Sequence, residues 1–192
     1  RARAGVGAAV SQNITDPALG PLMLDAMAEG HAPEQALQGL AERPFISYRQ
    51  LMAIDATRAP AIYTGSNALG RLASAQGEHA ACAGNMLASL DVPAAMLSAF
   101  EKTSGSLAER LMQAMLAGQA AGGEEGPVHS AGLLVVADLD WPIVDLRMDW
   151  VENCPVETLY EAWKVYEPQI QDYITRARDP RAAPSFGVPG NL

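Results

Sequence analysis

The sequence has 192 residues, which suits one domain and is short for two. Its 13 Lys and Arg against 22 Asp and Glu give a formal charge of −9, which argues against a protein that binds the phosphate backbone of nucleic acids. Apolar residues make up 49% and charged residues 18%, so the composition favours a packed core and argues against disorder.

The first half of the chain shows the patterns of one strand, then two helices, then a block of strands. Small residues over 4–12 predict a strand that another layer can approach closely. Asp16 and Pro17 are typical of a helix start and Gly30 of a helix end, and a second short helix is expected over 33–43. Further strands are predicted over 49–55, 61–64 and 76–85, the first two of them joined as a hairpin.

In the second half, Ser106 and Glu109 form a capping-box pattern at the start of a helix. Helices are predicted over 91–100, over 106–121 and from residue 155, the last one kinked or ended at Pro168. The continuous apolar run over 130–137 predicts a strand covered on both faces, and the alternation over 144–150 predicts another strand. Pairs of helices between blocks of strands indicate an α+β fold with antiparallel sheets under helical layers.

The end of the chain has a different composition. Pro, Gly and Ala dominate after residue 178. We therefore expect residues 1–178 to form a single domain and residues 179–192 to form an extended C-terminal tail.

Several familiar site patterns are missing from the sequence. Cys82 and Cys154 are far apart, so we expect no disulfide and a reducing, cytoplasmic compartment. The three histidines have no metal-ligand spacing, and the chain has no GxSxG or P-loop motif, so no metal and no cofactor are predicted. No run of about 18 apolar residues occurs, so no membrane span is expected. Gly5 and Gly7 mimic a dinucleotide-binding fingerprint without its third glycine, so a strand is the favoured interpretation and a nucleotide-dependent enzyme a weak alternative.

Three local features carry polar groups that suit a site. Gly84 and Asn85 end a predicted strand with a backbone N–H and a side-chain amide, which are the donors of an oxyanion hole. Gln12 ends another strand in the same way. Asp145 and Arg147 lie with Asp149 on one face of the strand over 144–150, where they form either a solvated face or a buried charged ladder.

A set of segments, taken in order, resembles one bacterial family. The segments are residues 3–8, 16–17, 20–21, 48–51, 63–66, 83–87, 118–123, 129–131, 133–136 and 144–149. Together they resemble the domain-of-unknown-function 1028 family, which is grouped with the N-terminal nucleophile (Ntn) hydrolases. The resemblance runs through most of residues 3 to 170.

The resemblance implies a four-layer α/β/β/α sandwich of antiparallel sheets. It also implies cleavage of an amide bond by the first residue of the mature chain, a Thr, Ser or Cys whose own α-amine is the general base. This sequence starts at Arg1, which is no nucleophile. We therefore expect the nucleophile and the family's N-terminal strand hairpin to lie upstream of residue 1, so that the fold seen here lacks that hairpin.

The resulting hypothesis is an amidohydrolase acting on a small-molecule amide. Gly84 and Asn85 would supply the oxyanion hole, and the pocket would be lined by Gln12, Gly65 and Ser66, with Ser130 as an outside candidate. Asp145 and Arg147 would hold the nucleophile's amine or a substrate carboxylate. The alternative is a non-catalytic ligand-binding or scaffold protein with the same fold. A homo-oligomer is expected because sheet edges need covering.

Overall fold

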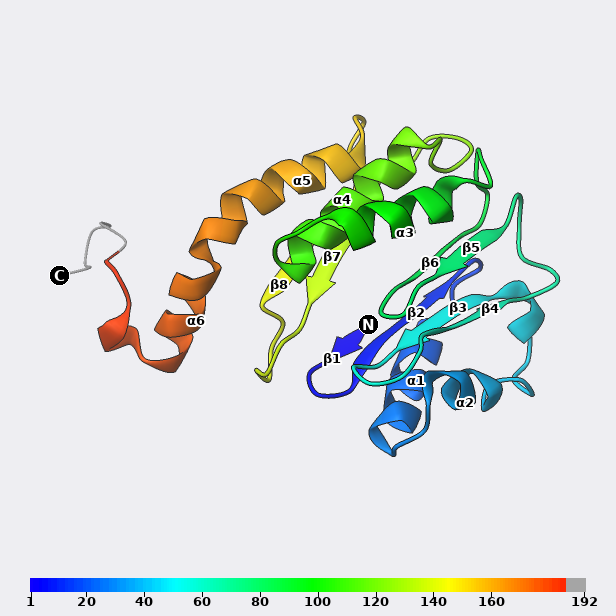
Figure 1. Ribbon diagram of the computed structural model, residues 1–192, viewed down its shortest axis with the longest axis horizontal. Coiled ribbons are helices and arrows are strands. Elements are labelled where there is room, and N and C mark those ends of the chain that lie inside the picture. The colour runs from blue at the N-terminus through cyan, green and yellow to red at the C-terminus, as the bar shows by residue number, and fades with distance from the viewer. Residues whose placement is uncertain (186–192) are drawn as a thin grey trace.

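The computed structural model describes residues 1–185, and a four-stranded antiparallel sheet forms its first part (Figure 1). The strands are β1 (Ala2–Arg3), β2 (Gly7–Gln12), β3 (Gln50–Ile54) and β4 (Ala61–Thr64), in the spatial order β1-β2-β3-β4. The predicted hairpin of 49–55 and 61–64 is confirmed. Of the predicted strand over 4–12, only Gly7–Gln12 is a strand, β2, because residues 4–6 form the turn that joins it to β1, with φ at +69° for Gly5. Gly7 lies inside β2 and no helix follows the two glycines directly, so they do not form the strand–loop–helix of a dinucleotide-binding fingerprint.

Two helices cover one face of this sheet. They are α1 (Leu19–Ala28) and α2 (Pro33–Gln38). Helix α1 begins three residues after Asp16, because the Asp16 carboxylate accepts a hydrogen bond from the Ala18 N–H at 3.0 Å and forms a turn first. Gly30 ends this helix with φ at +96°, as predicted. The first hydrophobic core lies between these helices and the strands, and its members include Ala9, Met23, Leu24, Met27, Leu37, Leu51, Ala53 and Ala61.

A short antiparallel hairpin lies against the opposite face of the sheet, where β6 contacts β3 and β4. It consists of β5 (Ala73–Gln76) and β6 (Ala81–Gly84), and the Gly77 N–H donates to Ala80 O at 2.9 Å across its turn. The prediction of one strand over 76–85 is therefore wrong. Helix α3 (Val92–Lys102) packs on both strands of the hairpin, so α1 and α2, the sheet, the hairpin and α3 are stacked in that order.

A second core forms around α4 (Leu107–Ala120) and α5 (Pro155–Tyr166). These helices cover a separate sheet of two strands, β7 (Ala131–Val135) and β8 (Val144–Met148) (Figure 1). Leu133 and Val135 on one face of β7 are buried, whereas on the other face Gly132 is exposed and Leu134 is half-buried, so the prediction of a strand fully covered on both faces is wrong. The core comprises Ala108, Met112, Leu133, Val135, Val144, Val156, Leu159 and Trp163.

The capping box at the start of α4 forms only in part. Ser106 Oγ accepts a hydrogen bond from the Glu109 N–H at 3.2 Å, as the pattern predicts. The Glu109 carboxylate instead accepts a hydrogen bond from Trp163 Nε1 at 2.8 Å. The residue that should close the cap therefore joins α4 to α5.

The chain ends in a second helical segment. A 3-10 turn at Pro168 separates α5 from α6 (Ile170–Arg178), which confirms the predicted kink. Another 3-10 turn, Pro180–Ala182, follows α6 inside the predicted tail of 179–192, and residues 186–192 of that tail lie outside the described residues. The mixed helices and antiparallel sheets confirm an α+β fold. Within residues 1–185, every helix is too short or too polar to cross a membrane.

Candidate functional site

Three polar side chains form a row across one end of the four-stranded sheet. Gln12 ends β2, Gln50 begins β3 and Thr64 ends β4, and the strand register places Gln50 directly opposite both of the others. Directly opposed residues share one face of a sheet. Gln12 Nε2 donates to Gln50 Oε1 at 2.6 Å, and Gln50 Nε2 donates to Thr64 Oγ1 at 3.0 Å. We call Gln12, Gln50 and Thr64 the polar row.

The polar row also binds the hairpin above it. Gln12 Nε2 donates to Ala83 O at 3.2 Å, and Gln50 Nε2 donates to Gly84 O at 3.3 Å. Gln50 is completely buried, so these bonds satisfy an amide that would otherwise be costly to remove from water. The row thereby fixes where the end of β6 sits over the sheet.

Asn85 follows directly after β6. Asn85 is 8% exposed, and neither its backbone N–H nor its side-chain amide has a hydrogen-bond partner among residues 1–185. Two adjacent donors without acceptors are the materials of an oxyanion hole. The Asn85 N–H belongs to the same trans peptide group as the Gly84 carbonyl that Gln50 holds, so it points away from that carbonyl oxygen.

Gly84 has a different role from the one predicted. Hydrogen-bonded and non-hydrogen-bonded pairs alternate along an antiparallel ladder. Counting from the Gly77–Ala80 bond, Gly84 falls at a hydrogen-bonded pair with Ala73, so its N–H points into the ladder. A Cβ at Gly84 would lie 2.5 Å from Leu87 Cδ2, so glycine permits the tight bend that presents Asn85. The donors left for a ligand are those of Asn85.

The loops around Asn85 are held in an uncommon conformation. Asn13, Ile14 and Met86 have φ values of 59°, 48° and 50°, in the left-handed region that few non-glycine residues adopt. The Asn13 side chain donates to Tyr48 O and accepts from the Leu69 N–H at 3.0 Å. Backbone strain of this kind costs about 1–3 kcal/mol per residue and is concentrated at functional sites.

Gly65 and Ser66 border the polar row, because they follow Thr64 directly. The Gly65 N–H donates to Arg49 O at 2.9 Å, and a Cβ at this position would overlap Ser47 O, so only glycine fits. Ser66 is exposed. The structure thus brings Gln12, Gly65, Ser66, Gly84 and Asn85 to one end of the sheet.

Ser130, Asp145 and Arg147 lie elsewhere, on and beside the β7–β8 sheet. No hydrogen bond or ion pair in the described part of the chain joins them to the polar row. Arg147 forms an ion pair with Asp149 at 2.6 Å, and their side chains are 70% and 74% exposed. The hydrogen bond to Asp149 raises the pKa of Arg147. The charges on β8 therefore form a solvated face, and the alternative of a buried ladder is wrong.

Comparison with known proteins identifies the family. The model of the "Family of unknown function (DUF1028)" matches residues 1–159. The chain belongs to the DUF1028 family.

One solved structure of the family resembles this DUF1028 protein closely. It is the crystal structure of protein SPO2555 from Silicibacter pomeroyi, with a TM-score of 0.78 and 28% sequence identity. The similarity covers 86% of this chain and 75% of the other. No curated protein matches the chain.

Sequence reasoning missed Gln50, Thr64 and Asn13 as site residues of this DUF1028 protein. A signal was available for Gln50, since its amide occupies a position that pairs with Gln12 once the two strands are set in register. The partners of Asn13 lie 35 and 56 residues away in the chain, so no local pattern reveals them. Within residues 1–185, no three His, Cys, Asp or Glu side chains are grouped so that they could hold a metal ion.

Cys82 lies in β6, three residues before Asn85. Its reactivity tests whether the β5–β6 hairpin shields this side chain from solvent. Burial and the nearby Glu101 carboxylate raise the pKa of Cys82 from 9.0 to about 11. At pH 8 only about one Cys82 in a thousand is then a thiolate. We expect iodoacetamide to alkylate the half-buried Cys154 well before Cys82 in the native protein, as measured by peptide mass spectrometry.

The raised pKa of Cys82 also makes the stability of the fold depend on pH. The Cys82 pKa is higher in the folded than in the unfolded chain, so its contribution is fully present below pH 9.0 and is lost as the pH rises through about 11. In guanidinium both cysteines should react at similar rates. Equal rates in the native protein would contradict a buried Cys82.

Proposed function

We propose that this DUF1028 protein is an Ntn-type amidohydrolase that cleaves a C–N amide bond of a small substrate. The observation that carries the proposal is the pair of unpartnered donors on Asn85, held over the sheet by the polar row. The α/β/β/α order of α1 and α2, the sheet, the hairpin and α3 supports the four-layer Ntn sandwich as its fold.

The proposed chemistry uses neutral groups to recognise an amide. The substrate carbonyl oxygen would accept hydrogen bonds from the Asn85 N–H and Nδ2, which stabilise the negative charge that develops on it. Gln12 Oε1 has no donor among residues 1–185 and could accept the substrate N–H. The Thr64 hydroxyl accepts from Gln50 and keeps its own hydrogen to donate.

The nucleophile is proposed to be the first residue of the mature protein, upstream of residue 1. The oxygen of its hydroxyl, or the sulfur of its thiol, would attack the carbonyl carbon. The proton of that hydroxyl or thiol would pass to the α-amine of the same residue. The amine would then protonate the leaving nitrogen as the C–N bond breaks, and water would release the acyl group. The proposal gives no role to Ser130, Asp145 or Arg147, because within residues 1–185 no hydrogen bond or ion pair joins them to the polar row.

The test begins with the full-length protein. Mass spectrometry identifies the mature N-terminal residue, and release of amine from a panel of small linear and cyclic amides measures activity. We expect Asn85→Ala to lower kcat by at least about 100-fold, as loss of one oxyanion donor does in other hydrolases.

Asn67→Ala is the matched control. Asn67 is exposed, and within residues 1–185 its side chain forms one hydrogen bond, from Nδ2 to Ser47 Oγ at 3.3 Å, so its loss should leave kcat within about twofold. An unchanged kcat in Asn85→Ala would remove the oxyanion assignment. A mature protein without an N-terminal Thr, Ser or Cys, and without hydrolysis of any amide, would favour the ligand-binding alternative.

A further inference from the structure

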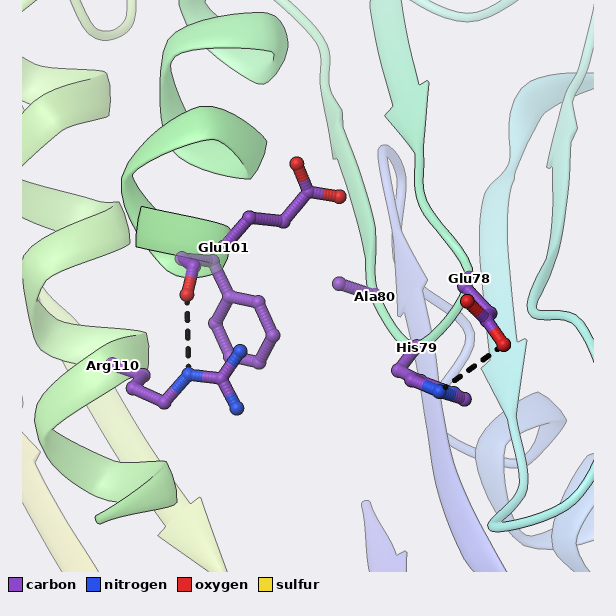
Figure 2. Close-up of a pocket in the computed structure, with 6 residues that line it drawn as sticks. Glu78, His79, Ala80, Glu101 and Arg110 are labelled. Atoms are coloured by element: carbon purple, nitrogen blue, oxygen red, sulfur yellow. Dashed lines mark hydrogen bonds and ion pairs between the residues drawn. The ribbon is translucent and has the colours of Figure 1, made fainter. Parts of the chain in front are cut away.

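A cavity at the other end of the β5–β6 hairpin brings charged side chains together over an apolar floor. It has a volume of about 230 Å³. Figure 2 shows the hairpin turn on one side and the end of α3 with the first turn of α4 on the other. The lining residues are Glu78, His79, Ala80, Phe100, Glu101 and Arg110. The cavity lies beside the turn of the hairpin, whereas Asn85 follows the opposite end of β6, so the two places are separate.

Arg110 presents a guanidinium that is already held in place. Its Cζ atom lies 4.0 Å from the centroid of the Phe100 ring, and its Nε donates to Phe100 O at 3.1 Å (Figure 2). These contacts use one face and one N–H of the group. Both Nη atoms remain without an acceptor among the described residues. A free guanidinium edge fits a carboxylate through two parallel hydrogen bonds.

Glu101 supplies the opposite charge. Its carboxylate forms no hydrogen bond or ion pair in the described part of the chain. Figure 2 marks no interaction between this carboxylate and Arg110. A Cβ at Gly77 would lie 2.6 Å from Glu101 Oε1, so the carboxylate reaches across to the hairpin turn because residue 77 is glycine. Its oxygens are available to a cation.

The two charges together select the kind of ligand. A simple anion on Arg110 would be repelled by Glu101, and a simple cation on Glu101 would be repelled by Arg110. A molecule that carries both charges satisfies both residues. At the rim, Glu78 and His79 contact each other at 3.5 Å and are largely exposed, so they add little to this selection.

We propose that this cavity binds a free α-amino acid. The ligand carboxylate would lie on the edge of Arg110, the ammonium group on Glu101, and the ligand side chain over Phe100 and Ala80. The cavity is smaller than the roughly 300–1,000 Å³ of pockets for drug-sized ligands, which agrees with a molecule of this size. The site is independent of the polar row, so Asn85→Ala should leave this binding unchanged.

The experiment is an NMR titration of the full-length protein that follows the backbone amide signals of Gly77 and Ala80. Three ligands are compared: L-leucine, N-acetyl-L-leucine without the ammonium group, and L-leucinamide without the carboxylate. We expect L-leucine to bind with a Kd on the order of 1 mM. Each derivative should bind weaker by about tenfold or more, since each loses one charge-assisted contact.

Two variants assign the charges. Glu101→Gln should weaken L-leucine by about tenfold and strengthen N-acetyl-L-leucine, because the like charge that repels its carboxylate is gone. Arg110→Met should weaken L-leucine and strengthen L-leucinamide for the corresponding reason. Glu78→Gln is the matched control and should not change the Kd. If Arg110→Met fails to fold, the Glu101→Gln variant with the three ligands still decides the outcome. Lack of shifts with millimolar L-leucine, or equal binding of N-acetyl-L-leucine, would overturn the proposal.

Discussion

Trp163→Ala is expected to lower the free energy of unfolding by about 3–5 kcal/mol. The Trp163 side chain is completely buried in the second core, and its Nε1 donates to Glu109 Oε2 at 2.8 Å. Truncation leaves a large cavity between α4, α5 and the β7–β8 sheet and deprives Glu109 of a donor. Domains are stable by only about 5–15 kcal/mol, so this change removes a large share of the total. Urea unfolding followed by far-UV circular dichroism measures it.

Two variants separate the causes. Trp163→Phe keeps most of the ring and removes the Nε1 donor, so it should cost about 1–3 kcal/mol. Trp150→Ala makes the same change at an exposed tryptophan that stacks on His129, and it should cost about 1 kcal/mol or less. Similar losses for Trp163→Ala and Trp150→Ala would contradict the placement of Trp163 in the core.

Gln50→Leu should cost about 2–4 kcal/mol although leucine is more apolar than glutamine. The substitution removes hydrogen bonds to Gln12, Thr64 and Gly84 O at a position with no access to water. A buried polar group left without a partner costs about 1–3 kcal/mol, which exceeds what a buried methyl group returns. Urea unfolding gives the loss, and hydrogen exchange of residues 84–87 should speed up because the end of β6 is released.

Gln38→Leu is the control for the change of side chain. Gln38 lies on the exposed surface of α2, where its Nε2 donates to Glu34 Oε1 at 3.1 Å. Its replacement should change the free energy of unfolding by about 0.5 kcal/mol or less. If Gln50→Leu were as mild as Gln38→Leu, or left exchange at residues 84–87 unchanged, the polar row would not be what positions Asn85.

Periodicity predicted the elements whose apolar pattern is continuous. The β3–β4 hairpin and α5 with its kink at Pro168 were expected from the sequence and are present. The β5–β6 hairpin was missed because Ala, Ser and Gly over residues 73–84 leave no alternation of apolar and polar side chains to read. The exposed face of β7 was missed because an apolar run does not reveal which of its faces is covered.

In the candidate site, too, some residues could be predicted from the sequence and others could not. Gln12, Gly65, Ser66, Gly84 and Asn85 were each placed at an element end from the sequence, and the fold brings them together. The separation of Asp145 and Arg147 from this group could not be foreseen, because it depends on how two independent sheets are arranged. The register of β2 against β3 decides that Gln50 stands opposite Gln12, and no tight turn fixes this register because two helices separate the strands in the chain.

The hydrogen bonds from the polar row to the hairpin are accepted by main-chain oxygens, those of Ala83 and Gly84. Every amino acid offers the same carbonyl, so the identity of the side chains on β5 and β6 is irrelevant to this attachment. Apart from Gly84, where a Cβ would meet Leu87, relatives can therefore exchange the side chains of β5 and β6, and with them whatever the hairpin presents to α3, while Asn85 keeps its position. The residues around the hairpin can therefore differ between relatives while the position of Asn85 over the sheet stays the same.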